Sequence, residues 1–211
     1  MIWKPQKVRS EEIEQAYRYI QERHDIYLKN GHDRRRAVEF VVDYVRESGK
    51  PVLDLGTGQG FSTVELAGRG QRVATVDISE ENLRKSYLYA ASRSVENMIE
   101  FHLADVEKLP FGDNDFDSIL MMNMLHHLKD FGRAASEIAR VTAPGGTLVI
   151  ADFTEKGFDI LEGVLESEGR SHDRDNGMML PDTREILWEY GLQCRQQDIR
   201  FEEHLMVAEK V

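Results

Sequence analysis

Apolar residues recur at helical spacing through the first part of the chain. Residues 11–29 and 34–48 each place apolar side chains three or four positions apart. This spacing is typical of helices that bury one face. Ser10 and Asp33 are candidate N-cap residues, and Gly49 is a candidate end for the second helix. We therefore expect two helices before the first strand.

From residue 51 onward, short apolar runs alternate with helical segments. Strands are predicted at residues 51–56, 72–78, 99–105, 116–123 and 147–153, and helices at residues 61–68, 79–92, 130–141 and 181–191. Residues 143–146 are predicted as a turn, and residues 193–211 as two further strands in a hairpin. Strands that alternate with helices imply a parallel sheet covered on both faces, here with an antiparallel edge. The pattern predicts a doubly wound α/β fold.

Composition narrows the class of protein. The 211 residues include 27 basic and 38 acidic side chains, giving a net charge of −11, which disfavours a nucleic-acid partner. The basic run at residues 32–36 is expected to be a solvated helix start. Cys194 is the single cysteine, which excludes an internal disulfide and a multi-thiolate metal site. No apolar run approaches the ~20 residues of a membrane span, and no secretory signal is evident, so we expect one cytoplasmic domain of undefined oligomeric state.

The stretch VLDLGTGQG, residues 52–60, places three glycines directly after an apolar run. Glycine is favoured where the backbone must adopt a positive φ or approach a ligand closely. Gly56 and Gly58 fit the dinucleotide fingerprint, but Phe61 stands where that fingerprint has its third glycine, and Gly60 comes one position earlier. Asp54 precedes the loop, and a carboxylate there suits a ligand with a cationic end better than a pyrophosphate.

Acidic residues also follow the next two predicted strands. Asp77 ends the second strand, where a carboxylate can accept both hydroxyls of a ribose. Asp105 ends the third, where it could accept from the amine of an adenine. Each aspartate also has a purely structural interpretation: Asp54 and Asp105 as turn residues, and Asp77 as a helix cap.

Together these motifs resemble the class I S-adenosylmethionine-dependent methyltransferases, of the small type that acts on small molecules. The resemblance rests on VLDLGTGQG, VDIS, ADVEKLPFGDNDFDSILMMNMLHHLKD and APGGTLVIAD, which span residues 51–152. It implies a Rossmann-like sheet of seven strands, S-adenosyl-L-methionine as cofactor, and a small-molecule acceptor; a protein acceptor stays open. Separately, a His/Asp metal site that includes His24 or His32 is conceivable, but the spacing supports no particular geometry, so no metal is expected.

The resemblance also implies roles for individual residues. The glycine loop and Thr57 would lie against the methionine and ribose portions of the cofactor, Asp54 near its ammonium group, Asp77 at the ribose, Ile78 on the adenine, and Asn123 at the methionine end. Asp105 and Val106 would contact the adenine. The residues assigned to the cofactor are Asp54, Gly56, Thr57, Gly58, Gly60, Asp77, Ile78, Asp105, Val106 and Asn123.

The catalytic apparatus is less clearly marked. Methyl transfer is an in-line displacement in which the protein mainly positions the reactants, and a base is needed only if the acceptor must lose a proton. His126 is the candidate base, with His127 second; either could instead pack locally. The polar residues 166–181 are a candidate acceptor loop. Tyr17, Tyr19 and Tyr27 are candidates to cover the cofactor.

The expected layout is an N-terminal helical cover at residues 1–49, a cofactor-binding core at 50–152, and acceptor loop and closing strands at 153–211. Two other functions stay open. One is a methyltransferase-like module that binds the cofactor without catalysis. The other is an NAD-dependent oxidoreductase, which Phe61 in the fingerprint argues against.

Overall fold

A computed structural model describes residues 1–171 and 178–211. Its centre is a seven-stranded sheet in the order β3-β2-β1-β4-β5-β7-β6. Only β7 runs antiparallel to its neighbours, β5 and β6. The strands are β1 (Val52–Leu55), β2 (Val73–Asp77), β3 (Ile99–Leu103), β4 (Phe116–Met122), β5 (Thr142–Phe153), β6 (Leu192–Arg200) and β7 (Glu203–Lys210). The predicted doubly wound, mostly parallel seven-stranded sheet with an antiparallel edge is confirmed.

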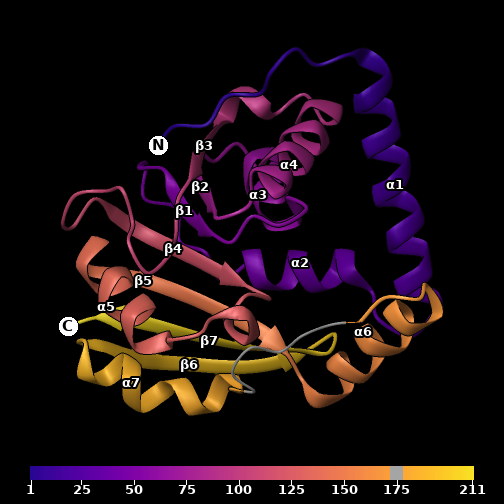
Figure 1. The fold of residues 1–211 in the computed structure, drawn as a ribbon. Coiled ribbons are helices and arrows are strands. Elements are labelled where there is room, and N and C mark those ends of the chain that lie inside the picture. Colours follow the sequence, from indigo (N-terminus) through magenta and orange to yellow (C-terminus); the bar gives the residue numbers. More distant parts are fainter. Residues whose placement is uncertain (172–177) are drawn as a thin grey trace.

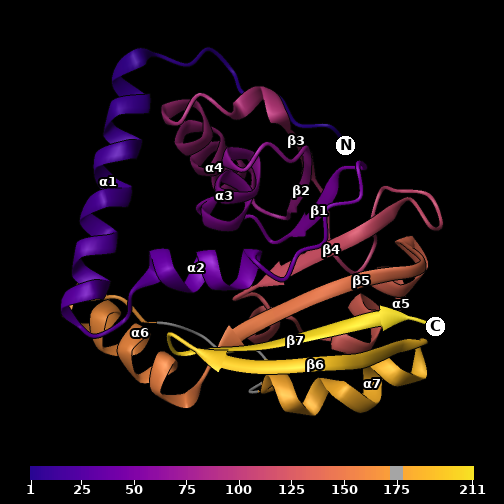
Figure 2. The same ribbon diagram turned by 180° about the vertical axis from the view of Figure 1, so that it is seen from behind.

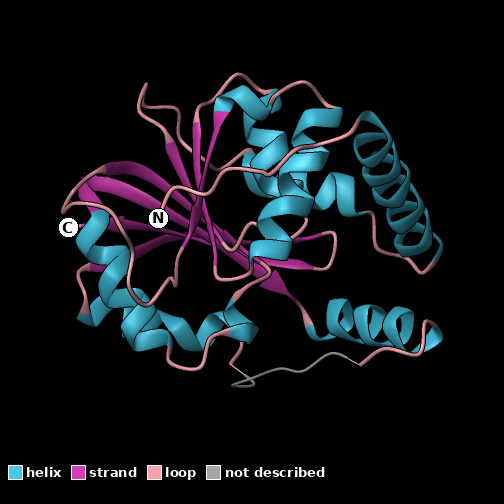
Figure 3. Cartoon of the chain, turned by 45° about the horizontal axis from the view of Figure 1, so that its top comes forward, coloured by secondary structure: helices cyan, strands magenta, loops and turns pink. Residues whose placement is uncertain are grey.

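Helices cover both faces of this sheet (Figures 1 and 2). The seven α-helices are α1 (Ser10–Lys29), α2 (Arg34–Val42), α3 (Phe61–Gly68), α4 (Glu80–Ser92), α5 (Phe131–Val141), α6 (Glu155–Ser167) and α7 (Thr183–Glu189), within the described residues. Short 3-10 turns occupy Glu96–Met98, Leu125–His127 and Leu180–Asp182. In the view of Figure 3 the sheet lies between the two helical layers.

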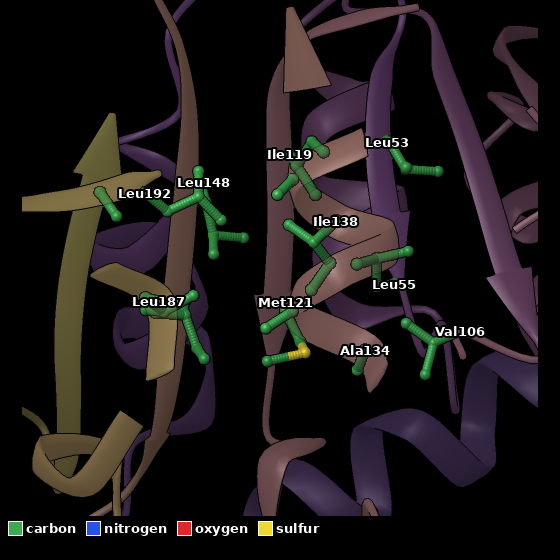
Figure 4. Packing of buried hydrophobic residues seen from close by; sticks show 14 of the residues in the cluster. Leu53, Leu55, Val106, Ile119, Met121, Ala134, Ile138, Leu148, Leu187 and Leu192 are labelled. Atoms are coloured by element: carbon green, nitrogen blue, oxygen red, sulfur yellow. The ribbon is translucent and has the colours of Figure 1, made fainter. Parts of the chain in front are cut away.

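Successive side chains of the central strands point to opposite faces of the sheet and pack into two separate hydrophobic cores. Leu53 and Met121 belong to the core shared with α5 and α7, whereas Val52 and Leu120 belong to the core shared with α2, α3 and α4. Figure 4 shows part of the first core, with side chains of β1, β4 and α5 packed together. This two-sided burial explains why these strands read as continuous apolar runs in the sequence.

The strand order reverses between β1 and β4. From β1 the chain builds outward through β2 and β3, then crosses back to place β4 on the other side of β1. In open sheets of this kind, ligands bind beyond the carboxyl ends of the strands at this reversal. The glycine loop follows β1 and Asn123 follows β4, so both lie there.

Most predicted elements occur where expected, and the differences have local causes. Asp33 and Ser79 cap α2 and α4 by accepting from backbone amides, as predicted, but Ser10 is the first helical residue and Arg9 precedes it. The second helix ends at Val42 rather than at residue 48, because the following residues form tight turns that lead the chain into β1.

Two segments near β5 differ from expectation. The predicted turn at residues 143–146 is part of β5, where its extra residues form an irregularity in the pairing with β4. Helix α6 was not predicted, and its last two residues, 166 and 167, belong to the candidate acceptor loop. Of the candidate acceptor loop, residues 172–177 lie outside the described residues.

Candidate functional site

The loop between β1 and α3 takes a conformation that requires its glycines. Gly58 and Gly60 have φ angles of +51° and +85°. A Cβ on Gly60 would lie 2.9 Å from Ser86 Cα, so this position is closed by packing. A Cβ on Gly58 would have one atom within 4 Å, the Gly56 carbonyl oxygen at 3.9 Å. The loop is therefore closely packed against α4 at Gly60, whereas at Gly58 it has open space beside it.

Two buried aspartates hold this loop in place. Asp54 accepts hydrogen bonds from Ser62 Oγ at 3.0 Å and Thr75 Oγ1 at 3.0 Å, and also from Thr63. Burial raises the pKa of the Asp54 carboxyl, and the three hydroxyls oppose that rise. Asp77 accepts from the backbone N–H of Gly58 at 2.9 Å. The loop is thereby tied to both β1 and β2.

The residue that follows β2 has an apolar side chain that is exposed to solvent. Ile78 follows Asp77 directly and is 73% exposed. Asp105, at the equivalent place after β3, is also exposed, and its Oδ1 accepts from Glu107 N at 2.9 Å. Val106 beside it is buried in the core. An exposed isoleucine at the end of β2, with a carboxylate at the end of the neighbouring β3, suits a flat ring with polar edges.

A cavity of about 280 Å³ opens above the glycine loop. Its floor comes from the loop and from Asn123, at the ends of β1 and β4. Its walls come from α1, α2, α6, the start of β7 and the turn after β4. The cavity therefore lies at the reversal of strand order, where the fold predicts a ligand.

His126 and Asp152 form a buried pair at the cavity wall. His126 Nδ1 lies 2.8 and 2.9 Å from the two carboxylate oxygens of Asp152, and the backbone N–H of His126 donates to Oδ2 at 3.2 Å. Their exposed fractions are 2% each. An ionised carboxylate only accepts, so the hydrogen of a neutral imidazole here is on Nδ1. The pair fixes both the orientation and the tautomer of the ring.

A second buried polar group lies beside it, contributed by three distant segments. Asn123, at a positive φ of 53°, donates from Nδ2 to Glu203 Oε1 at 3.1 Å. His32 Nε2 lies 3.9 Å from the same oxygen. Burial raises the pKa of Glu203 well above its usual range, and the charge of Asp152 adds to this rise. Burial also lowers the pKa of His32 to about 4. His32 is therefore neutral near pH 6, and Glu203 keeps its proton to a higher pH than an ordinary glutamate does.

Arginines line the outer part of the cavity. The guanidinium of Arg34 stacks on Tyr27 and Phe61, with its carbon 4.4 and 4.1 Å from the two ring centroids. Arg23 pairs with Glu168 at the end of α6 and donates to Tyr27 Oη at 3.2 Å. Helices α1 and α6 are thus linked across the cavity.

Comparison with known proteins identifies the class. A family model described as a methyltransferase domain matches residues 53–150. The chain is 38% identical over 129 residues to a demethylmenaquinone methyltransferase of Corynebacterium glutamicum, which covers 60% of this chain and 52% of that protein. It is 34% identical over 122 residues to methyltransferase GfsG of Streptomyces halstedii, covering 56% of this chain and 44% of that protein. The chain thus spans about half the length of these curated relatives.

Residues 53–150 are a methyltransferase domain. The similarity in fold to solved structures extends beyond residues 53–150. The crystal structure of a SAM-dependent methyltransferase from Aquifex aeolicus superimposes with a TM-score of 0.67 at 20% identity, covering 97% of this chain and 100% of that one.

Within the methyltransferase domain, the sequence-predicted residues fall into three groups. Gly56, Thr57, Gly58, Asn123 and His126 line the cavity. Asp77, Ile78 and Asp105 lie together along the ends of β2 and β3, outside the cavity lining. Asp54, Gly60 and Val106 lie behind the loop or in the core, and their expected cofactor contacts stay predictions.

The sequence also allowed purely structural roles for the aspartates, as a helix cap or as turn residues, and the structure decides two of these roles. Ser79, not Asp77, is the N-cap of α4, and Asp77 accepts from Ser79 N at 2.8 Å beside it. Asp105 does form a tight turn with Glu107. Among the three candidate tyrosines, Tyr27 reaches the cavity that the methyltransferase domain shares with α1; Tyr17 and Tyr19 do not line it.

Sequence reasoning missed four residues that line the cavity, Arg23, His32, Arg34 and Glu203. It also missed Asp152, the buried partner of His126. Glu203 begins β7, the strand that runs antiparallel, so its first residue rather than its last reaches the site. An acid at the start of a predicted antiparallel strand was the available signal. The arginines lie on helices outside the methyltransferase domain, where no motif marks them.

Other kinds of site have little support in the described ranges, 1–171 and 178–211. No three potential metal ligands of the His, Cys, Asp or Glu type cluster there. Nor does any helix in those ranges have the length and apolarity needed to cross a bilayer.

Proposed function

We propose that this chain transfers a methyl group from S-adenosyl-L-methionine to a small-molecule acceptor, with His126 as the general base that Asp152 orients. The observation that carries the proposal is the His126–Asp152 pair, held at 2.8 Å on the wall of a cavity floored by the glycine loop. The relative named a demethylmenaquinone methyltransferase supports a small-molecule acceptor.

The residues present fit the cofactor. The open face of Gly58 admits close approach of a ligand, and the exposed Ile78 offers an apolar surface for the adenine. Asp77 would hold the ribose: its contacts to Asn82 Nδ2, both 3.3 Å, are its longest and the easiest for ribose hydroxyls to replace. Asp105 would accept from the adenine amine. When bound, the cofactor supplies an electrophilic methyl group.

The remaining chemistry belongs to the chain. With its hydrogen on Nδ1, the His126 ring has its lone pair on Nε2, the nitrogen that can take a proton. Taking the acceptor's proton would make an imidazolium, which the Asp152 carboxylate stabilises. Cover by α1 and α6, joined through Arg23 and Glu168, limits water at the reacting atoms.

Removing Asp152 tests this proposal most specifically. Asp152→Asn lets the histidine adopt the other tautomer, and His126→Ala removes the base. Each should lower kcat by about 10²- to 10⁴-fold while leaving affinity for S-adenosylhomocysteine nearly unchanged. The assay would follow labelled methyl transfer to a panel of phenols and hydroxy acids. Asp117→Asn, a carboxylate at the far end of β4 paired with Lys50, is the matched control.

A second readout needs no acceptor. Nitrogen-15 NMR of the histidines should show His126 as the Nδ1–H tautomer in the parent protein and not in Asp152→Asn. A kcat unchanged in both variants would contradict the base assignment. Tight S-adenosylhomocysteine binding with no methyl transfer to any member of the panel would favour a binding module instead.

A further inference from the structure

Unpartnered buried polar atoms gather at one cavity. Ten buried side-chain nitrogen or oxygen atoms lack a hydrogen-bond partner among the described residues. Five of the ten belong to side chains that line the cavity above the glycine loop: Arg23, His32, Gln59, Asn123 and Glu203. Buried polar groups without partners are costly and uncommon. Their concentration here indicates a surface shaped for a polar ligand.

Arg34 differs from the other arginines of this cavity. Arg23 and Arg170 both pair with Glu168. No described residue forms an ion pair with Arg34, although Tyr27 and Phe61 hold its guanidinium by stacking. Stacking occupies the faces of a guanidinium and leaves its N–H edges for a planar anion, which can bind in bidentate fashion.

Basic side chains outnumber acidic ones in the lining of the cavity, although the whole chain has a net charge of −11. Three arginines line it, and Glu203 is the single acid among its described lining residues. Burial keeps Glu203 protonated to a higher pH than usual, so it offsets little of that charge. The proposed cofactor carries a sulfonium, an ammonium and one carboxylate, and is a net cation. Since Glu168 already pairs with Arg23 and Arg170, Arg34 is the arginine left to receive an anionic group of the acceptor.

The rest of the cavity limits the acceptor's size and character. Phe153, Leu161 and Leu165 supply apolar side chains to the same cavity. A volume of about 280 Å³, part of which the methionine end would fill, accommodates a small molecule only.

We infer that the methyl acceptor is a small organic acid, with an apolar body against Phe153 and Leu165 and a carboxylate received by Arg34. This inference rests on the proposed function and gives its substrate class. Arg34 is then a specificity-determining residue, distinct from the His126–Asp152 pair.

The test compares acids with their amides in the presence of saturating S-adenosylhomocysteine. The probes are 4-hydroxybenzoate with 4-hydroxybenzamide, and 4-hydroxyphenylacetate with its amide. Since a charge-assisted bidentate pair is involved, each acid should bind about tenfold or more tightly than its amide. Arg34→Gln should abolish this preference, and Arg34→Lys should keep part of it. Arg35→Gln, the same change on an exposed neighbour of the same helix, should keep all of it.

Three results would separate the explanations. Equal binding of acids and amides by the parent protein would overturn the inference. A large loss of S-adenosylhomocysteine affinity in Arg34→Gln, with the acid preference retained, would also overturn it and assign Arg34 to the cofactor's own carboxylate. If the parent protein does not bind S-adenosylhomocysteine, the proposed function is contradicted instead. The preference for acids over amides would then be measured in the absence of S-adenosylhomocysteine.

Discussion

The two sides of the cavity differ in how their polar groups are satisfied. On the β1–β2 side, the buried Asp54 accepts from hydroxyls, and the buried Asp77 accepts from backbone amides and from the side-chain amide of Asn82. On the side built by α1, α2 and β7, no described residue forms an ion pair with Arg34, and His32 and Glu203 each have one buried atom without a hydrogen bond to that part of the chain. The first side is organised before any ligand arrives, whereas the second is completed by one.

This contrast follows from what each side must do. A loop that approaches a cofactor along its backbone needs a fixed shape, and internal hydrogen bonds supply it. A surface that discriminates among acceptors must present unused donors and acceptors, and it retains the cost of burying them until the ligand binds. Changes on the β1–β2 side should therefore damage the fold or cofactor binding, and changes on the other side should alter charge-dependent behaviour.

The largest effect is expected at the packed glycine of the loop. Gly60→Ala would place a methyl group 2.9 Å from Ser86 Cα at a φ of +85°, and should cost about 2–5 kcal/mol of unfolding free energy from strain and overpacking together. Gly58→Val, at the open position, should leave most of the stability and abolish S-adenosylhomocysteine binding. Urea denaturation and calorimetry on the two variants check this. Equal stability of both variants would contradict the distinction between the two positions.

An acid-dependent loss of stability should come from the other side. The folded pKa of His32 is about 4, below its usual 6.5, because the ring is buried. The folded protein thus binds this proton less tightly than the unfolded chain does, so stability falls as pH drops from about 6.5 to 4, by up to about 3 kcal/mol. His32→Asn should remove that slope. Unfolding measured across this pH range checks it, and identical slopes for the two proteins would refute the assignment.

A smaller effect is expected at the ribose position. Asp77→Asn keeps the size of the side chain but loses its charge, so affinity for S-adenosylhomocysteine should fall about tenfold or more. Glu80→Gln, nearby at the start of α4 and exposed, is the control. If Asp77→Asn folds normally and binds with parental affinity, Asp77 serves the loop alone.

The residues that could be predicted from the sequence lie on the β1–β2 side of the cavity, and most of those that could not be predicted lie on the other side. Gly56, Gly58, Asp77 and Asn123 follow strands within one continuous stretch, so local patterns were enough to place them at the same edge of the sheet. Arg34 and Glu203 are separated by 169 positions in the numbering. They meet only because α2 packs over the sheet and β7 returns antiparallel to the strand ends.

The pairing of His126 with Asp152 illustrates the same limit at shorter range. Both follow or end strands that neighbour each other in the sheet, β4 and β5, and the sequence marked His126 as a candidate. The partner was not evident, because Asp152 lies one residue before the end of a strand that also contains the Pro-Gly-Gly irregularity. Strand register, which decides this contact, is not encoded in the local pattern.

Calorimetric titration of the parent protein with S-adenosylhomocysteine, and separately with NAD, tests the central claim most directly. A methyltransferase with its cofactor side already organised should bind one S-adenosylhomocysteine per chain and show no saturable binding of NAD. Saturable NAD binding in the absence of S-adenosylhomocysteine binding would contradict the account and favour the oxidoreductase alternative.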